Sequence, residues 1–282
     1  MVTIFAWLVG AIALGIIALA VWLYEPDKPR AALEETYHGE YRIIEGVRLR
    51  LRDSGPRDSE AVIMLHGFGA SLETWEKWAE ALSARYRVIR FDLPGFGLTG
   101  SDPTGDYTDA RSMQVLAGLM GQLDIDRASL IGNSLGGRIA WNFAAVFPER
   151  VNRLVLVSPD GFASPGFDYG VAPKVPLIMR ALLYTAPRSM LKANLAAAYG
   201  NPTALSDADV TRYHDLMLAP GVRRAILQRM GQVILREPGP ILAQIQAPTL
   251  LVWGELDGMI PISNAQDYLR FLPNAAPRTC AF

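Results

Sequence analysis

The sequence predicts an α/β fold in which helices cover both faces of a mainly parallel sheet. Strand-like and helix-like segments alternate from about residue 47 to residue 157, and the alternation returns after residue 249. The run Ala61–Leu65 is apolar throughout, as is typical of a parallel strand that is buried on both faces. Because parallel neighbours need long crossover connections, each connection supplies a helix that can cover the sheet.

The expected elements follow one another in a regular order. Val47, Leu49 and Leu51 alternate with arginines, which predicts an early edge strand with one face in water. Further strands are expected at residues 61–65, 87–91, 128–131, 154–157 and 249–253. The helical spacing of apolar residues predicts helices at residues 75–82, 113–123, 135–147 and 263–271.

The chain between these two stretches has a different character. Proline-containing turns separate apolar helical segments, which predicts an inserted helical cap at residues 162–241. The α/β core is then expected at residues 40–161 and 242–282. One core with an insertion fits a length of 282 residues.

The N-terminal segment is strongly apolar. Residues 2–24 contain no charged side chain, and at about 1.5 Å per residue they can cross a hydrocarbon layer of roughly 30 Å. We therefore expect a transmembrane anchor at residues 1–24, with membrane lipid as its partner, and a linker at residues 25–39. A cleaved signal peptide is the alternative, but no basic stretch precedes the apolar run. The expected location is single-pass in a bacterial inner membrane, with the side left open.

Composition excludes several classes of function. The net charge of −1 provides no broad positive field, so nucleic acid is not an expected partner. The single cysteine excludes an internal disulfide, and the three histidines are too scattered in sequence to suggest a metal site. We expect chemistry without a metal or another cofactor.

The strongest motif is Gly132-Asn133-Ser134-Leu135-Gly136, which lies between an expected strand and an expected helix. This G-x-S-x-G pattern is typical of a sharp turn that exposes a nucleophilic serine, with glycines that let the strand and the helix approach closely. The dipole of the following helix favours negative charge that develops at its N-terminus. Ser134 is therefore the candidate nucleophile.

Two further loops complete the candidate site. His66-Gly67-Phe68-Gly69 follows an expected strand, and the backbone N–H of Phe68 is predicted to join that of Leu135 in an oxyanion hole. We interpret His66 as a residue that braces this loop. Asp257 follows a late strand, as the acid of a catalytic triad would. Asp160, after the preceding strand, is the backup acid, and Glu255 is a weaker neighbour.

Taken together, the segments VIMLHGFGAS, RFDLPGFGLTG, LIGNSLGGRIAW and LLVWGELDGMIP resemble the α/β-hydrolase superfamily over residues 40–274. The resemblance extends to bacterial membrane-anchored esterases and lipases, and it implies serine hydrolysis of an ester or a related acyl substrate. Serine at the elbow, where haloalkane dehalogenases and epoxide hydrolases carry aspartate, argues against those two reactions.

The C-terminus departs from the family pattern. Related sequences continue with an eighth strand, a loop that bears the catalytic histidine and a terminal helix. After Asn274 this sequence shows no strand-like run and no histidine. We therefore expect a core that is incomplete at its C-terminus, with an exposed sheet edge and no triad base. His38 and His214 do not occupy the expected position of a base.

The leading functional prediction is an esterase or lipase that acts on a small-molecule apolar acyl ester, inactive if the histidine is truly absent. One alternative is a membrane-anchored binding protein without catalysis. Another is a carbon–carbon bond hydrolase, which needs polar groups for a dienoate substrate. Arg138, Arg180 and Arg188 are candidates for that contact, and the sequence leaves open which of them faces the pocket.

Overall fold

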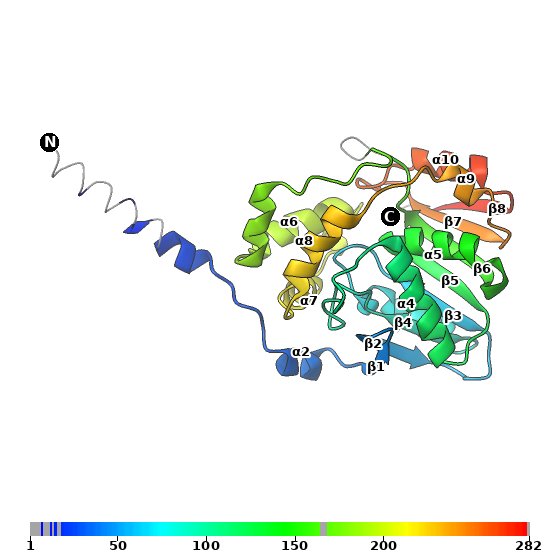
Figure 1. Ribbon diagram of the computed structural model, residues 1–282, viewed down its shortest axis with the longest axis horizontal. Helices are drawn as coiled ribbons and strands as arrows, with labels where there is room; N and C mark the ends of the chain where they lie inside the picture. The colour runs from blue at the N-terminus through cyan, green and yellow to red at the C-terminus, as the bar shows by residue number, and fades with distance from the viewer. Residues whose placement is uncertain (1–6, 8–11, 13, 16–17, 164–167, 281–282) are drawn as a thin grey trace.

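The computed structural model describes residues 7, 12, 14–15, 18–163 and 168–280 (Figure 1). Among these residues, eight strands form one sheet in the order β1-β2-β4-β3-β5-β6-β7-β8. The strands are β1 (Glu40–Ile44), β2 (Val47–Ser54), β3 (Ala61–Leu65), β4 (Arg87–Phe91), β5 (Ala128–Ser134), β6 (Val151–Pro159), β7 (Thr249–Gly254) and β8 (Ala275–Cys280). β2 pairs antiparallel with both β1 and β4, and every other pairing is parallel.

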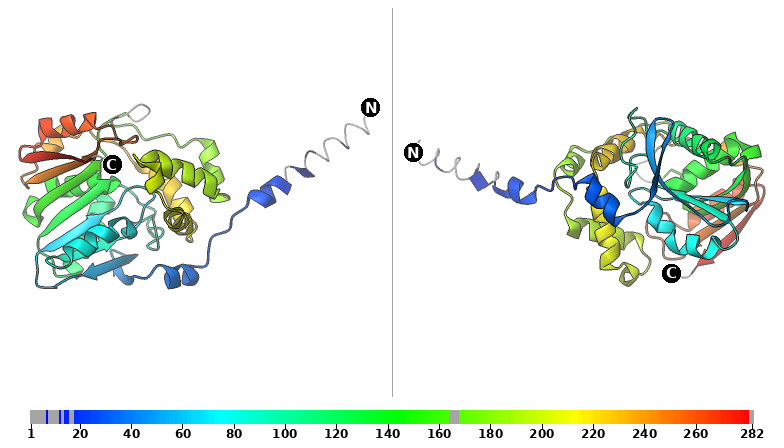
Figure 2. Two further views of the ribbon diagram at one scale, coloured as in Figure 1. Left: turned by 180° about the vertical axis from the view of Figure 1, so that it is seen from behind. Right: turned by 90° about the horizontal axis from the view of Figure 1, so that it is seen from below.

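Helices pack on this sheet and form a separate group beside it. They are α2 (Arg30–Thr36), α3 (Glu76–Leu82), α4 (Asp109–Gln122), α5 (Leu135–Val146), α6 (Arg188–Ala198), α7 (Asp207–Met217), α8 (Val222–Gln232), α9 (Gly239–Leu242) and α10 (Ser263–Phe271). Short 3₁₀ turns add η1 (Leu72–Trp75), η2 (Pro148–Arg150), η3 (Leu177–Leu183) and η4 (Pro202–Ala204). Figure 1 shows α6, α7 and α8 grouped to one side of the sheet, away from α4 and α5, and Figure 2 shows the same arrangement from two other directions.

Alternate side chains of β3 are buried on opposite faces of the sheet. Ile63 belongs to the same buried cluster as Val115 of α4 and other side chains of α5. Met64, its neighbour, belongs to a second cluster with Ala79 of α3. This alternation explains why the strand is apolar at every position. The predicted mainly parallel sheet with helices on both faces is confirmed.

The early part of the sheet differs from the prediction. β2 is not an edge strand, because β1, which the sequence pattern did not reveal, covers its outer side. Arg50 is fully buried instead of facing water. Its guanidinium donates to Asp92 Oδ2 at 3.1 Å and also to Glu73. The alternation predicted that this side chain faces water. Its burial is tolerated because two carboxylates pair with the guanidinium.

The C-terminal segment also differs from the prediction, because residues 275–280 form the strand β8. It runs parallel to β7 with Ala275 opposite Thr249 and Cys280 opposite Gly254. Most of its side chains are exposed and one of them is Pro277, which an edge strand tolerates. The expectation of an uncovered edge at β7 was therefore wrong.

The predicted membrane anchor at residues 1–24 lies largely outside the described residues. In the parts of the chain that the structure describes, none of the helices is both long enough and apolar enough to cross a bilayer. The predicted single-pass location in a bacterial inner membrane is corrected on this finding.

The segment that the sequence presented as a linker makes specific contacts with the helices beside the sheet. Lys28 Nζ lies 2.6 Å from Asp215 of α7, and Asp27 pairs with Arg223 of α8 at 2.7 Å. Arg30 donates to the carbonyl of Leu98 in the core at 2.6 Å. Residues 27–30 therefore connect the helical insertion to the α/β core.

Candidate active site

Ser134 occupies a sharp turn between β5 and α5. It is the last residue of β5 and the N-cap of α5, with φ 49° and ψ −117°. A positive φ at a non-glycine residue costs of order 1–3 kcal/mol and persists only where packing enforces it. This conformation, with the helix N-terminus directly behind it, is the geometry expected of a nucleophile elbow.

Two glycines make this turn possible. A Cβ on Gly132 would lie 2.4 Å from the carbonyl oxygen of Gly136, and a Cβ on Gly136 would lie 2.2 Å from the carbonyl oxygen of Leu65. Neither position has room for a side chain, because real Cβ atoms do not approach other atoms so closely. The motif therefore reflects direct contact between β5, α5 and the neighbouring strand β3.

The predicted oxyanion loop lies against the elbow. A Cβ on Gly67 would lie 2.8 Å from Asn133 Oδ1 and 3.4 Å from Ser134 Cβ. Leu135 is buried as the first residue of α5, and Phe68 is about half exposed at 47%. Gly67, which directly precedes Phe68, and Leu135 thus bring backbone from a loop and from a helix N-terminus to Ser134.

His66 has the position of a brace and not of a base. Its Nε2 accepts the backbone N–H of Leu93 at 2.9 Å, so its Nδ1 carries the proton and donates to the carbonyl of Gly67 at 2.8 Å. Complete burial lowers the pKa of His66, which keeps the ring in this neutral form. Both ring nitrogens are occupied in holding the oxyanion loop.

Asp160 directly follows β6 and contacts the elbow through its backbone. Its N–H donates to the carbonyl of Ser134 at 3.1 Å. Its carboxylate accepts from Arg138 Nη1 at 2.8 Å, and Arg138 also donates to Asp109 at 3.2 Å. The backup acid is therefore committed to an ion pair with a buried arginine.

Asp257 lies in the loop after β7, at the same end of the sheet as Ser134. Its Oδ1 accepts the backbone N–H groups of Met259 and Ile260, both at 2.9 Å. Among the described residues, no lysine, arginine or histidine forms an ion pair with this carboxylate. The assignment of Asp257 as the acid stays a prediction. The side chain of Glu255 is exposed, and its backbone N–H donates to the carbonyl of Cys280.

The other two histidines are held elsewhere. His214 Nε2 lies 3.0 Å from the carbonyl of Ala186 and 3.4 Å from Glu25. The carbonyl of His38 accepts from Arg50 and Arg52. Within the described parts of the chain, no imidazole hydrogen-bonds the Ser134 hydroxyl and no cluster of three or more histidine, cysteine or acidic side chains could hold a metal ion.

Two polar residues with structural roles, Asn133 and Arg229, were missed by the sequence interpretation. Asn133 donates to the carbonyl of Val157 at 3.0 Å and so ties β5 to β6 beside the nucleophile. Arg229 of α8 is 1% exposed and donates to backbone carbonyls of the core. A single arginine in a helical region carries no sequence signal for such a role. Of the three arginines considered for a dienoate, Arg138 is buried beside the elbow, whereas Arg180 and Arg188 lie in the helical insertion.

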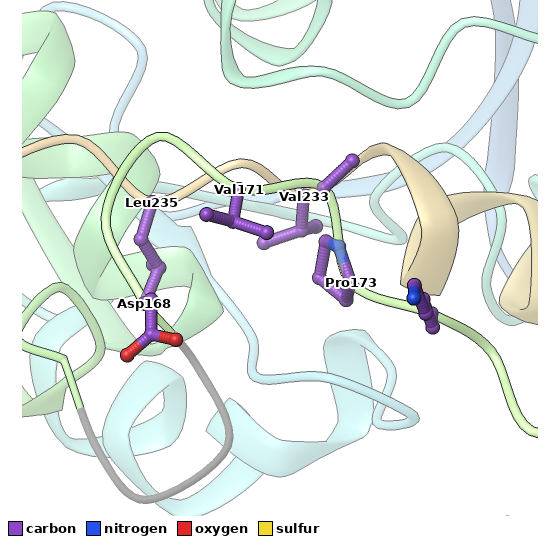
Figure 3. A pocket seen from close by; sticks show the side chains of 7 residues that line it. Asp168, Val171, Pro173, Val233 and Leu235 are labelled. Atoms are coloured by element: carbon purple, nitrogen blue, oxygen red, sulfur yellow. The ribbon is translucent and has the colours of Figure 1, made fainter.

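A pocket lies apart from these residues. It has a volume of about 260 Å³ and separates the segment 168–174 from the chain that follows α8 (Figure 3). Its lining consists of Asp168, Val171, Ala172, Pro173, Lys174, Val233 and Leu235. None of the candidate catalytic residues lines it.

Comparison with known proteins agrees with the fold and the elbow. A family model described as alpha/beta hydrolase fold matches residues 60–280. The chain therefore belongs to the alpha/beta hydrolase fold family.

Its sequence relatives include enzymes named for dienoate substrates. A 2-hydroxy-6-oxononadienedioate/2-hydroxy-6-oxononatrienedioate hydrolase of Paraburkholderia xenovorans is 34% identical over 240 residues, which cover 78% of this chain and 79% of that protein. A 2-hydroxy-6-oxo-6-phenylhexa-2,4-dienoate hydrolase of Burkholderia cepacia is 29% identical, with 82% of each chain covered. A solved meta-cleavage product hydrolase from Pseudomonas fluorescens has the same fold, with a TM-score of 0.72, 24% identity and coverage of 86% of this chain and 89% of that chain.

Proposed function

We propose that this chain is a serine-dependent hydrolase that cleaves a carbon–carbon bond in a 2-hydroxy-6-oxo-dienoate. The observation that carries the proposal is the strained Ser134 elbow in a chain whose relatives, aligned over about four fifths of its length, are named as hydrolases of such dienoates. This reverses the order of the functional predictions. The carbon–carbon bond hydrolase becomes the leading function, and the esterase or lipase becomes the second candidate.

The structure of the named substrate explains why a carbon–carbon bond is the target. 2-Hydroxy-6-oxo-6-phenylhexa-2,4-dienoate contains no ester or amide, so its hydrolysis has to break a bond between carbons. When its C2 enol becomes a ketone and C5 takes the proton, C5 lies between the C6 ketone and an enone. Cleavage of the C5–C6 bond then leaves its electron pair delocalised in that enone as a dienolate, which is protonated. Water ends on C6, which gives benzoic acid and a five-carbon hydroxydienoate.

The elbow residues have roles that suit attack on the C6 ketone. The Ser134 hydroxyl is the nucleophile, and its addition to C6 places negative charge on the ketone oxygen. The backbone N–H groups of Phe68 and Leu135 are the proposed donors to that oxygen. Loss of one such donor slows comparable enzymes by about 10²–10³. Asp257 is the proposed acid that orients a base.

Arg138 lies one turn beyond Ser134 on α5 and is a candidate for contact with the substrate. Its side chain is 3% exposed and joins Asp109 of α4 to Asp160 after β6. The Nη2 atom of Arg138 is buried without a partner among the described residues. This makes Arg138 the better candidate of the three predicted arginines for contact with an anionic substrate group.

The proposal is tested by comparing substrates in the presence of added imidazole, since none of the described imidazoles reaches Ser134. Turnover of the phenyl dienoate is measured beside that of short and long p-nitrophenyl esters. We expect dienoate cleavage that rises with imidazole concentration and is higher in kcat/KM than ester cleavage. Ser134→Ala should lower it by about 10³-fold or more, whereas Ser59→Ala, in a surface turn, should not change it.

Each other outcome identifies a competing function. A higher kcat/KM for an ester than for the dienoate, still dependent on Ser134, would replace the proposal by the esterase or lipase. Saturable binding of the dienoate without any turnover at high imidazole would favour the binding protein. Equal rates in the wild type and in Ser134→Ala would contradict all serine-dependent functions.

A further inference from the structure

The ring of Phe96 contacts both the helical insertion and the oxyanion loop. Phe96 is 1% exposed in the turn that follows β4. Its centroid lies 5.3 Å from that of Phe68 and 5.7 Å from that of His66, both in edge-to-face geometry. The guanidinium carbon of Arg229 lies 5.3 Å from the same centroid. One buried ring therefore contacts α8 and the loop that flanks Ser134.

Arg229 holds the backbone around this ring. Its Nη2 donates to the carbonyl of Pro94 at 2.8 Å, and its Nη1 donates to the carbonyl of Tyr107 at 3.2 Å. Arg50, Arg87, Arg90, Arg111, Arg138 and Arg223 are also buried, and each of them forms an ion pair with a carboxylate. In the described chain Arg229 forms no such pair. Burial lowers its pKa to about 10, so the side chain remains a cation at neutral pH.

A second route joins the same turn to the oxyanion loop through hydrogen bonds. Leu93, just before Pro94, donates its N–H to His66, and His66 donates to Gly67. Gly67 in turn lies against Ser134. A shift of the Pro94–Phe96 turn would therefore displace both the aromatic contact and the hydrogen-bonded brace of the loop.

We propose that Arg229 is a positioning residue for the reaction: from α8 it fixes the Phe96 turn and thereby the oxyanion loop, residues 66–69. The N–H of Phe68 is then held where the oxyanion forms only while α8 is docked on the core. The role of Phe68 as an oxyanion donor rests on the proposed function. The mechanical coupling of Arg229 to the loop does not. A misplacement of about 1 Å at such a donor is enough to slow a reaction by about 10²-fold.

The coupling is tested by hydrogen exchange, which requires no turnover. Arg229→Met keeps an apolar contact with Phe96 and removes the bonds to Pro94 and Tyr107. Arg224→Met, on the exposed side of the same helix, is the matched control. We expect amides 66–69 to exchange at least about tenfold faster in Arg229→Met only, with the exchange of β3 and α5 unchanged. Unchanged exchange at 66–69, or an equal increase throughout the core, would overturn the proposal.

Kinetics then separate positioning from general stability. In imidazole-supported dienoate turnover, Arg229→Met should lower kcat by about 10- to 100-fold with little change in KM, and Arg229→Lys should recover part of the loss. Phe96→Leu should cause a similar loss, and the double variant should be no worse than the poorer single variant. If the losses in kcat multiply in the double variant, or if only KM changes, the proposed coupling of Arg229 to the oxyanion loop is contradicted. If the wild type shows no dienoate turnover, the proposed function fails while the exchange result still decides the coupling.

Discussion

The Ser134 elbow and the Asp257 loop, the two halves of the proposed site, are held in different ways. The elbow has a strained backbone, two glycines in contact with neighbouring backbone, and a hydrogen bond from Asp160 to the carbonyl of Ser134. Among the described residues, the carboxylate of Asp257 accepts hydrogen bonds only from two amides of its own loop. The nucleophile is therefore fixed by packing among distant segments, whereas the acid depends on local turn geometry.

The largest expected effect is at the elbow. Gly136→Ala should lower the free energy of unfolding by more than about 3 kcal/mol, because its Cβ would overlap the carbonyl of Leu65 in β3. Urea unfolding measures the loss. Gly121→Ala in α4 is the control, because nothing lies within 4 Å of its Cβ position, and it should raise stability by about 0.5–1 kcal/mol. Equal stability of the two variants would show that packing does not define the elbow.

The next effect concerns the ion pair beside the elbow. Asp160→Asn should lower the free energy of unfolding by about 2 kcal/mol, because it leaves Arg138, which is 3% exposed, with a weaker partner. The loss is smaller than for a fully buried pair because the Asp160 side chain is 34% exposed and Asp109 still pairs with Arg138. A smaller loss of unfolding free energy than that of Asp257→Asn in the same assay would contradict the expectation that the elbow is held more firmly than the acid loop.

A third test uses the pH dependence of stability that His66, the brace of the oxyanion loop, is expected to cause. Burial lowers the pKa of His66, so the folded state keeps it neutral while the unfolded chain binds a proton below about pH 6.5. The contribution of His66 to stability is therefore complete above that pH and is lost as the pH falls toward the folded pKa. Between pH 7.5 and pH 5, His66→Gln should show a shallower loss of unfolding free energy than the wild type, by up to about 1.4 kcal/mol per pH unit. Parallel pH profiles would rule out a neutral brace.

The smallest effect is expected at the acid loop. Asp257→Asn should change the free energy of unfolding by less than about 1 kcal/mol, because the Oδ1 of asparagine can still accept the amides of Met259 and Ile260. Thermal unfolding of both proteins at the same pH provides the measurement. A loss as large as that of Asp160→Asn would mean that Asp257 has structural contacts of its own.

The same contrast explains which parts of the molecule the sequence could reveal. The elbow was predictable because the two glycines that its close contacts require stand in one five-residue motif around Ser134, even though Gly136 packs against Leu65 of β3. β8 was missed because most of its side chains are exposed, and only its backbone pairing with β7 makes it a strand. The burial of Arg50 depends on Glu73 and Asp92, which lie 23 and 42 residues away, so no local sequence pattern predicts it. Arg229 is a similar case, since its partners belong to a loop more than 100 residues earlier.

The most direct test of the central claim is a search for the covalent intermediate. The chain is mixed with the phenyl dienoate and imidazole, stopped with acid, digested and examined by peptide mass spectrometry. We expect a benzoyl group on the peptide that carries Ser134, formed together with the five-carbon hydroxydienoate and absent from Ser134→Ala. Formation of the dienoate fragment without an acyl group on Ser134, and at the same rate in Ser134→Ala, would contradict it.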